Sequence, residues 1–451
     1  MSDIIAAIAT GRAPCAIGIL RLSGPGCAAL TGRVFTPKQP FADAPDRRLV
    51  LGLLHDRQGR VIDECLGVVC RAPHSYTGEE TVELQCHGSP AMLAAGLEAL
   101  LAAGARQAGP GEFTRRAFLN GKLDLTQAEA VVDLIDAETA DAAANAAGQL
   151  GGALKRAIEP VYDGLTDLCS HFHAVLDYPD EDIDPFELSQ LESALQASSR
   201  TLSALLSSCH RGRMVRSGVR VTILGSPNAG KSSLLNALSG FDRVIVTDIP
   251  GTTRDTVEQT VTLGRHLVRL VDTAGIRDTE DVIEKIGVDR SVEAAKDCDA
   301  ALFVVDDSRP LTDEDRRAMD AALEAPEAIA VLNKQDLGAV IEPSDLPFSY
   351  IVPVSCKDGT GFDLLEQAFD MLFPDDAPCD GSLLTNARQA DAIVRAKKSV
   401  DAALRSLRAG FTPDAVLVDL EAAMRALGEV TGRTMREDIT NRIFERFCVG
   451  K

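Results

Sequence analysis

Residues 225–232 read Gly225-Ser226-Pro227-Asn228-Ala229-Gly230-Lys231-Ser232 and fit the pattern G-x-x-x-x-G-K-[ST]. The apolar run Val221–Leu224 precedes this loop, and the helix-forming run Leu234–Leu238 follows it. In this order of strand, loop and helix, backbone N–H groups at the start of the helix bind phosphate. We expect Lys231 to reach the β and γ oxygens and Ser232 to bind Mg²⁺. The alternation of strands and helices around the loop predicts an α/β domain with a parallel sheet.

Four more motifs follow in the order expected of a guanine-nucleotide domain. Gly251-Thr252-Thr253 offers Thr253 as a second Mg²⁺ ligand, and Asp272-Thr273-Ala274-Gly275 follows an apolar run and offers Asp272 to the metal through water. Asn333-Lys334-Gln335-Asp336 specifies guanine, because the Asp336 carboxylate can accept both the N1–H and the exocyclic amine. Ser355-Cys356-Lys357 completes the set. The five motifs predict a Ras-like P-loop domain over residues 216–373 that binds and hydrolyses GTP.

The means of hydrolysis is less ordinary. Ras-like enzymes place a water-orienting glutamine directly after the glycine of the third motif, whereas Ile276 follows Gly275 here. Glu284 is a nearby carboxylate that could act through the second switch. The alternative is a solvated helical glutamate with no role in hydrolysis, which the sequence pattern does not distinguish from a catalytic one. No arginine finger is evident in the chain. A monovalent cation held by Asn228 and by backbone oxygens of the first switch could supply the missing positive charge.

Length and composition restrict the class of protein. With 451 residues, the chain exceeds one core and predicts about three domains at ~150 residues each. The formal charge of -21, from 46 basic and 67 acidic residues, repels nucleic acid on average, so any RNA contact needs a local basic patch or a partner. The 11 cysteines contain no C-x-x-C pair. With no secretory signal and no apolar run of ~18 residues, we expect a cytoplasmic protein without a membrane segment.

The regions that flank the nucleotide domain differ from it in their predicted secondary structure. Residues 1–120 mix strand-like runs (16–22, 61–70 and 81–86) with a helix-like run at 91–103, which predicts an α+β domain. Residues 121–215 and 374–451 carry apolar residues at helical spacing. We therefore expect a discontinuous all-α domain, with the nucleotide domain inserted between its two parts.

Several longer stretches together resemble the MnmE (TrmE) family of tRNA-modifying GTPases. The likeness covers the whole chain, and its motifs are long. They are Gly18-Ile19-Leu20-Arg21-Leu22-Ser23-Gly24, Val82-Glu83-Leu84-Gln85-Cys86-His87-Gly88, the run from Pro110 through Lys122 to Leu125, Thr247-Asp248-Ile249-Pro250-Gly251-Thr252-Thr253-Arg254-Asp255, and Phe447-Cys448-Val449-Gly450-Lys451.

This resemblance implies a reaction that the nucleotide motifs alone do not. Family members work with an FAD- and NADH-using partner, MnmG, on C5 of the wobble uridine (U34) of certain tRNAs. The one-carbon unit comes from a tetrahydrofolate derivative, and hydrolysis is stimulated when G domains dimerise around K⁺. The resemblance further implies a homodimer that forms a heterotetramer with two partner subunits, a folate-binding and dimerisation role for residues 1–120, and a C-terminal C-x-G-K motif in the second helical part.

Carried over by position, the resemblance assigns roles to individual residues. Glu284 falls on the catalytic glutamate, and Cys448 falls on the C-terminal cysteine, for which a buried structural thiol is the alternative. The folate pocket would be lined by Arg21, Glu83, Lys122 and Lys451. K⁺ would be held by Asn228, Thr247, Ile249 and Thr252. The predicted GTP contacts are Asn228, Ala229, Gly230, Lys231, Ser232, Ser233, Thr247, Asp248, Ile249, Pro250, Gly251, Thr252, Thr253, Asp272, Thr273, Ala274, Gly275, Asn333, Lys334, Asp336, Ser355, Cys356 and Lys357.

Two other readings share the nucleotide motifs. An Era-type ribosome-assembly GTPase would need an RNA-binding appendage such as a KH domain, and neither the acidic charge nor the rest of the sequence supports one. A non-catalytic scaffold that changes shape with GTP is the third reading. Multiple turnover of GTP would distinguish it from an enzyme.

Overall fold

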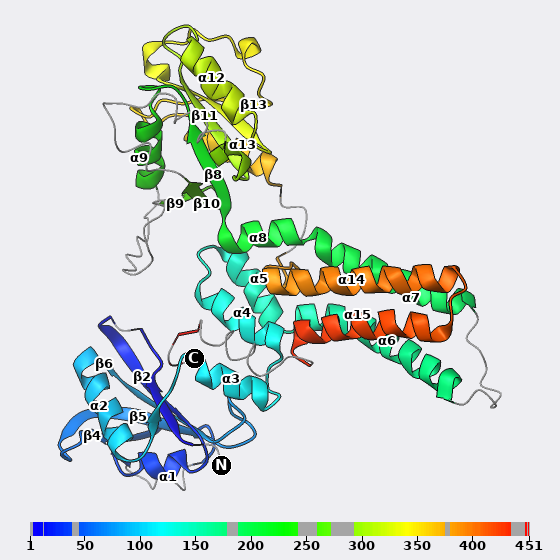
Figure 1. Ribbon diagram of the computed structural model, residues 1–451. Helices are drawn as coiled ribbons and strands as arrows, with labels where there is room; N and C mark the ends of the chain where they lie inside the picture. The colour runs from blue at the N-terminus through cyan, green and yellow to red at the C-terminus, as the bar shows by residue number, and fades with distance from the viewer. Residues whose placement is uncertain are drawn as a thin grey trace. The chain divides into compact units, whose positions relative to one another are not determined.

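The computed structural model describes residues 3–11, 13–37, 45–177, 188–241, 259–271, 293–374, 379–433, 447–448 and 450 (Figure 1). The chain separates into two compact units. One contains residues 1–136, 146–206 and 388–451, and the other contains residues 137–145 and 207–387.

The first unit begins with a seven-stranded sheet in the order β3-β4-β5-β6-β2-β1-β7. All pairs are antiparallel except β1 with β7. Helix α2 covers one face, where Gly18 and Gly96 leave room for close packing with Leu93 and Leu20. The elements are β1 (Ile5–Ile8), β2 (Cys15–Ser23), α1 (Cys27–Thr31), β3 (Phe35–Pro37), β4 (Val50–His55), β5 (Val61–Cys70), β6 (Thr81–Gly88), α2 (Pro90–Ala102) and β7 (Arg106–Gln107).

Helices from both ends of the chain pack together in the same unit. Glu129 accepts hydrogen bonds from Arg388 at 2.9 and 2.7 Å and from Gln389 at 2.8 Å, and Ser199 donates to Asp401 at 2.6 Å. α6 also packs along α15. The helices are α3 (Glu112–Leu119), α4 (Leu125–Ile135), α6 (Ala153–Asp177), α7 (Leu188–Ser207), α14 (Ala387–Arg408) and α15 (Pro413–Thr431). Helix α5 (Ala140–Leu150) is divided, with its residues up to 145 in the second unit and the rest in the first.

The second unit is built on a six-stranded sheet in the order β13-β12-β11-β8-β10-β9, in which only β9 is antiparallel. Apolar side chains form a core on each face of this sheet, as expected for strands buried on both sides. Its elements are α8 (Cys209–Ser217), β8 (Val219–Leu224), α9 (Lys231–Phe241), β9 (Gln259–Leu263), β10 (His266–Val271), β11 (Ala300–Asp306), α12 (Asp313–Ala322), β12 (Ala328–Asn333), η1 (Gln335–Leu337), η2 (Pro343–Asp345), β13 (Tyr350–Pro353) and α13 (Phe362–Leu372).

An α+β N-terminal part, helices before and after the nucleotide domain, and an α/β P-loop domain are thus present, as the sequence predicts. The strand expected at 61–70 coincides with β5, and β2 and β6 are one or two residues longer than expected. The helix expected at 91–103 is α2, shifted by one residue. Among the described helices, none combines the length and the apolar character needed to cross a bilayer.

Candidate functional site

The loop between β8 and α9 has the backbone shape that phosphate binding requires. Gly230 has a φ of 103°, and a Cβ there would lie 2.0 Å from Nδ2 of Asn333, so only glycine fits. Asn228 also adopts a left-handed conformation, with a φ of 62°. Lys231 Nζ donates to the carbonyl oxygens of Gly225 and Ser226 at 2.7 and 2.9 Å. Burial lowers the pKa of Lys231. Its ammonium group is therefore held inside the loop, where phosphate oxygens would bind.

The loop after β12 connects the predicted guanine-specifying residues to the phosphate loop. Asn333 Nδ2 donates to the carbonyl oxygen of Ala229 at 3.0 Å, and the backbone N–H of Cys356 donates to Asn333 Oδ1 at 3.3 Å. Asn333 is buried. The contact of Cys356 is thus made by its backbone. The Asn333 side chain joins three of the five motifs in one rigid group.

Asp336 faces the loop that contains Ser355 and Lys357. Its carboxylate accepts from Ser355 Oγ at 3.1 Å and pairs with Lys357 Nζ at 3.2 Å. The hydrogen bond from Lys357 lowers the pKa of Asp336, so the side chain is a carboxylate at neutral pH, as guanine recognition requires.

These residues surround one open cavity of about 840 Å³, a size that suits a nucleotide. It brings together side chains from the phosphate loop, the helix that follows it and both base-specifying loops. The lining residues are Pro227, Asn228, Gly230, Lys231, Ser232, Ser233, Asn333, Lys334, Asp336, Leu337, Cys356 and Lys357.

A buried carboxylate that the motifs do not reveal supports the phosphate loop. Asp315 is fully buried, and its Oδ1 accepts a hydrogen bond from Ser226 Oγ at 2.5 Å. Its Oδ2 accepts from Arg309 Nη1 at 2.7 Å and from Thr312 N and Oγ1 at 2.9 and 2.6 Å. Burial alone would raise the pKa of Asp315, but the hydrogen bonds from Arg309 and Ser226 hold it well below its usual value. Asp315 is therefore a charged anchor for the phosphate loop.

The same group of charges reaches the base-specifying loop. Arg309 Nε lies 3.8 Å from Asp306 Oδ2, and that oxygen accepts from Lys334 Nζ at 2.6 Å. A line of hydrogen bonds and ion pairs therefore runs from Ser226 through Asp315, Arg309 and Asp306 to Lys334. One part of this network can be recognised in the sequence, because Thr312 and Asp315 have the spacing of a capping box at the start of α12.

Some predicted site residues lie outside the described residues. These are Thr247, Asp248, Ile249, Pro250, Gly251, Thr252, Thr253, Asp272, Thr273, Ala274, Gly275, Glu284 and Lys451.

In the N-terminal domain, Arg21 and Glu83 are brought together by the pairing of β2 with β6. Arg21 Nε donates to Glu83 Oε1 at 2.8 Å, and Arg21 Nη1 donates to the carbonyl oxygen of Gly450 at 3.3 Å. The rings of Tyr76 and Phe113 lie with their centres 5.8 Å from the Arg21 guanidinium carbon. Two of the four predicted folate residues therefore meet beside aromatic rings and the C-terminal segment.

The other described candidates of this domain lie as follows. Lys122 Nζ donates to the carbonyl oxygen of Pro73 at 3.2 Å, and its side chain packs against Gly78. Cys448 is exposed, and its carbonyl oxygen accepts from the backbone N–H of Gly111 at 3.2 Å. An exposed Cys448 thiol does not fit the alternative of a buried structural cysteine.

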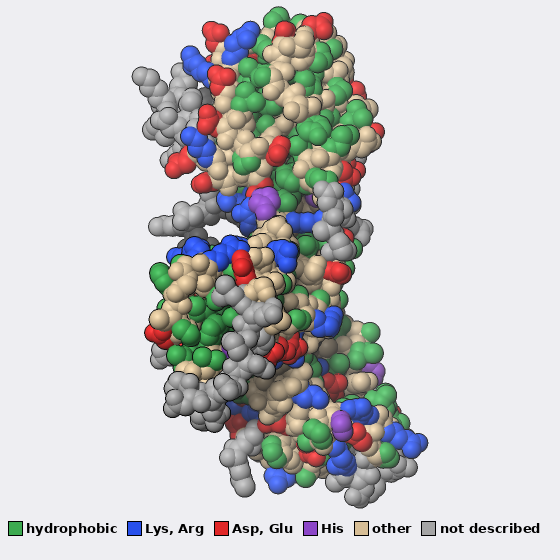
Figure 2. All heavy atoms as spheres, turned by 90° about the vertical axis from the view of Figure 1, so that its right-hand side faces the viewer, with side chains coloured by type: hydrophobic (Ala, Val, Ile, Leu, Met, Phe, Trp, Pro, Cys, Tyr) green, Lys and Arg blue, Asp and Glu red, His purple; other side chains and the backbone are tan. Residues whose placement is uncertain are grey.

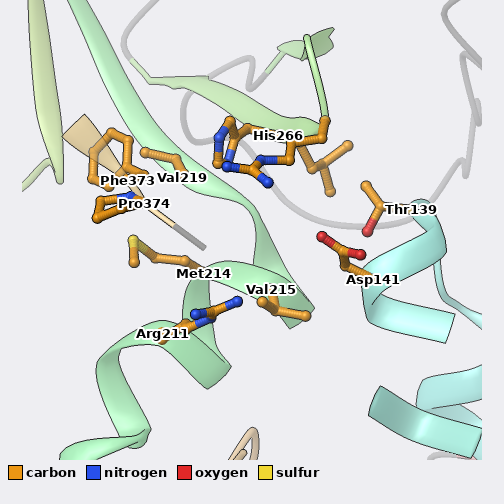
Figure 3. A pocket seen from close by; sticks show the side chains of 11 residues that line it. Thr139, Asp141, Arg211, Met214, Val215, Val219, His266, Phe373 and Pro374 are labelled. Carbon is orange, nitrogen blue, oxygen red and sulfur yellow. The ribbon is translucent and has the colours of Figure 1, made fainter. Parts of the chain in front are cut away.

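A second, smaller cavity of the nucleotide unit has a volume of about 60 Å³ (Figure 3). Arg211 and Met214 of α8, Asp141 of α5 and His266 of β10 line it. Burial lowers the pKa of His266 despite its 2.9 Å contact with Asp370, so the ring is mostly neutral at pH 7. The cavity is too small for a nucleotide, and it lies apart from the five motifs.

Comparison with known proteins gives consistent matches along the whole chain. Residues 4–122 match the family described as GTP-binding protein TrmE N-terminus, and residues 125–448 match the MnmE helical domain. Relatives named tRNA modification GTPase MnmE include those of Roseiflexus sp. (strain RS-1), at 44% identity, and of Symbiobacterium thermophilum, at 43%. Each alignment covers 100% of this chain and 99% of the relative. The protein of Roseiflexus castenholzii is 42% identical with the same coverage.

Proposed function

Because the chain belongs to the MnmE family of tRNA modification GTPases, and is thus a GTP hydrolase of tRNA modification, we propose that it modifies C5 of the wobble uridine (U34) of certain tRNAs. It would act together with an FAD- and NADH-using MnmG-type partner and use a tetrahydrofolate one-carbon unit. The observation that carries this proposal is that one chain contains both a nucleotide pocket lined by the guanine-specifying residues and the Arg21–Glu83 site. GTP turnover by the first would drive the reaction supported by the second.

The nucleotide pocket supports a division of labour among its residues. Asp336 would accept the two guanine donors, and Lys231 would exchange its contacts with loop carbonyls for contacts with phosphate oxygens. Ser232 lines the cavity at the start of α9 and suits a Mg²⁺ ion, with Thr253 as the second ligand and Asp272 acting through water. Bound Mg²⁺ would neutralise charge on the β and γ phosphates.

The left-handed Asn228 lines the same cavity and offers a carboxamide oxygen to a monovalent cation. We infer that K⁺ is held there by Asn228 together with Thr247, Ile249 and Thr252, and that it supplies the charge that an arginine finger provides elsewhere. Glu284 would orient the attacking water, because Ile276 cannot. Dimerisation of two nucleotide domains would complete this arrangement.

The Arg21 site suits a folate by its donor chemistry. A guanidinium group recognises carboxylates, a glutamate accepts from an amide-like pterin edge, and Tyr76 and Phe113 offer aromatic faces. Lys122 and Lys451 would contribute further positive charge toward the glutamate tail. Bound tetrahydrofolate would supply the one-carbon unit, and the exposed Cys448 thiol is the nucleophilic group we assign to the modification step.

The proposed homodimer is supported by the face of the N-terminal sheet opposite α2. Leu51 and Leu53 of β4 point to this face and are 37% and 36% exposed, and Ile17 of β2 is 61% exposed. Leu51 and Leu53 are neighbours on β4, whereas β5 and β6 lie between them and Ile17. Exposed apolar side chains on one face of a sheet favour a protein–protein interface. Two partner subunits would then bind the dimer as a heterotetramer.

The tRNA would contact local groups of basic residues, because the chain as a whole is acidic. Figure 2 shows Lys and Arg side chains interspersed with acidic ones on the face it presents. All 11 cysteines are free thiols, which fits a reducing cytoplasm.

Nucleoside analysis of total tRNA from a deletion strain tests the modification. We expect the C5-modified wobble uridine to disappear and to return with the unaltered chain but not with a Lys231→Ala variant. Unchanged nucleosides in the deletion strain would refute the proposal. GTP hydrolysis in matched KCl and NaCl tests the cation, and equal rates in the two salts would refute its role.

A further inference from the structure

Three potential metal ligands meet where β5 and β6 pair in the N-terminal sheet. The ligand atoms of Asp63, Cys65 and Cys86 all lie within 4.8 Å of one another. The antiparallel ladder of β5 with β6 ends at the pair of Leu66 and Gln85, and Cys65 and Cys86 are the next residues beyond that pair. Both cysteines are only 3% exposed. All three residues therefore lie in two neighbouring strands and not in a loop.

The Asp63 carboxylate is an unusual member of this group. Its side chain is 8% exposed, and its recorded partner is His87, whose backbone N–H donates at 2.8 Å and whose Nδ1 lies 2.7 Å away. No Lys or Arg side chain within the described ranges pairs with Asp63. The carboxylate is held by His87 and lies beside two sulfur atoms, so a cation bound among the three would be stabilised by its negative charge.

We propose that Asp63, Cys65 and Cys86 bind one Zn²⁺ ion, a site separate from the nucleotide pocket. Two sulfur ligands and one carboxylate suit a borderline-soft ion, whereas Mg²⁺ and K⁺ prefer oxygen alone. Tetrahedral coordination would place these ligand atoms about 3.3–3.8 Å apart, which the present group reaches with shifts of about 1 Å. A water molecule would fill the fourth position.

His87 completes the arrangement as a positioning residue. Its contact with Asp63 would fix the orientation of the carboxylate, as partners of metal ligands commonly do. Cys86 lies three residues beyond Glu83 on β6, so a bound ion would also stiffen the strand that carries Glu83, the partner of Arg21. The role we assign to the ion is therefore structural.

Cobalt binding to the full-length chain tests the site. The protein is stripped with a chelator under reducing conditions and titrated with Co²⁺, and thiolate-to-cobalt charge-transfer absorption is then reversed with Zn²⁺. We expect about one such site per chain, retained in Cys70→Ser, which changes another cysteine of β5. Cys65→Ser and Cys86→Ser should lose the absorption, and Asp63→Asn should weaken Co²⁺ binding by roughly tenfold or more.

Alkylation of the unaltered chain removes any dependence on how the variants fold. In mild denaturant, Zn²⁺ should slow the labelling of Cys65 and Cys86 together, by roughly tenfold or more, while the labelling of Cys70 stays unchanged. Absence of cobalt–thiolate absorption, its persistence in Cys65→Ser, or equal labelling with and without Zn²⁺ would each overturn the proposal. The two thiols would then simply pack as small apolar groups.

Discussion

The buried carboxylate of Asp315 makes a sharp prediction, because so many donors converge on it. Asp315→Asn keeps the shape of the side chain but replaces one acceptor oxygen with an NH₂ group. The amide cannot satisfy Arg309, Ser226 and both donors of Thr312 at once. We therefore expect the start of α12 and the phosphate loop that it supports to be destabilised together.

The size of this effect follows from burial. Removing one partner of a fully buried ion pair costs about 3–5 kcal/mol. Arg309 is 33% exposed and can partly rehydrate, whereas Asp315 is not exposed at all. We expect a local loss of about 2–4 kcal/mol, and a GTP affinity reduced roughly tenfold because Ser226 loses its charged partner.

Hydrogen exchange of the full-length chain, followed by mass spectrometry, measures this loss in the peptides that cover α12 and the phosphate loop. Asp313→Asn is the matched control, since it removes an exposed carboxylate from the first turn of the same helix. Its effect should stay within about 0.5 kcal/mol. If Asp315→Asn exchanges like Asp313→Asn and binds a fluorescent GTP analogue normally, the anchoring role is wrong.

Four further outcomes follow. Asp336→Asn should lower GTP affinity roughly tenfold or more and shift preference toward xanthosine nucleotides, measured by competition binding; an unchanged preference would contradict guanine recognition by this loop. Glu284→Ala should slow single-turnover hydrolysis by ~10²–10⁴-fold and leave GTP affinity nearly intact, whereas a normal rate would retire it as the catalytic residue. Arg21→Ala should weaken the binding of a tetrahydrofolate derivative in calorimetry without changing GTP hydrolysis, and equal binding would place the folate elsewhere. The pKa of Asp315 is lower in the folded state than in the unfolded state, so its carboxylate stabilises the fold above the unfolded pKa near 4, and this stabilisation is lost as the pH falls toward the folded pKa. Acid should therefore destabilise the wild type more steeply than Asp315→Asn, as measured by hydrogen exchange.

Local patterns predict much of the fold. The run before Gly225, the loop and the apolar run after it correctly place a strand, a phosphate loop and a helix, because all three are set by residues close in sequence. Likewise, the apolar spacing after residue 387 predicts the helix α14. The roles of the residues in 242–258 and 272–292 stay predictions, since these ranges lie outside the described residues.

Contacts between distant segments could not be predicted in the same way. Ser226 and Asp315 are 89 residues apart, and their hydrogen bond exists only because α12 begins beside the phosphate loop. The pairing of Arg21 with Glu83 depends on the register of β2 and β6, which hydrophobic alternation alone does not determine. For these two residues the resemblance to a family indicated a shared site, and the register supplied the physical reason.

The meeting of α8 with the segment before α14 has a consequence for how such a protein can arise and be rebuilt. Ser208 Oγ lies 3.1 Å from the backbone N–H of Leu384, and Gly212 packs so closely on the Leu384 carbonyl that a Cβ would lie 2.1 Å from its oxygen. The chain between Ser208 and Leu384, which are 176 positions apart, therefore begins and ends at one place, at roughly the spacing of a short turn. A host chain can accept or lose such a module with little cost in loop closure. Grafting a different nucleotide-binding module between Ser208 and Leu384 is accordingly a practical route to chimeric enzymes.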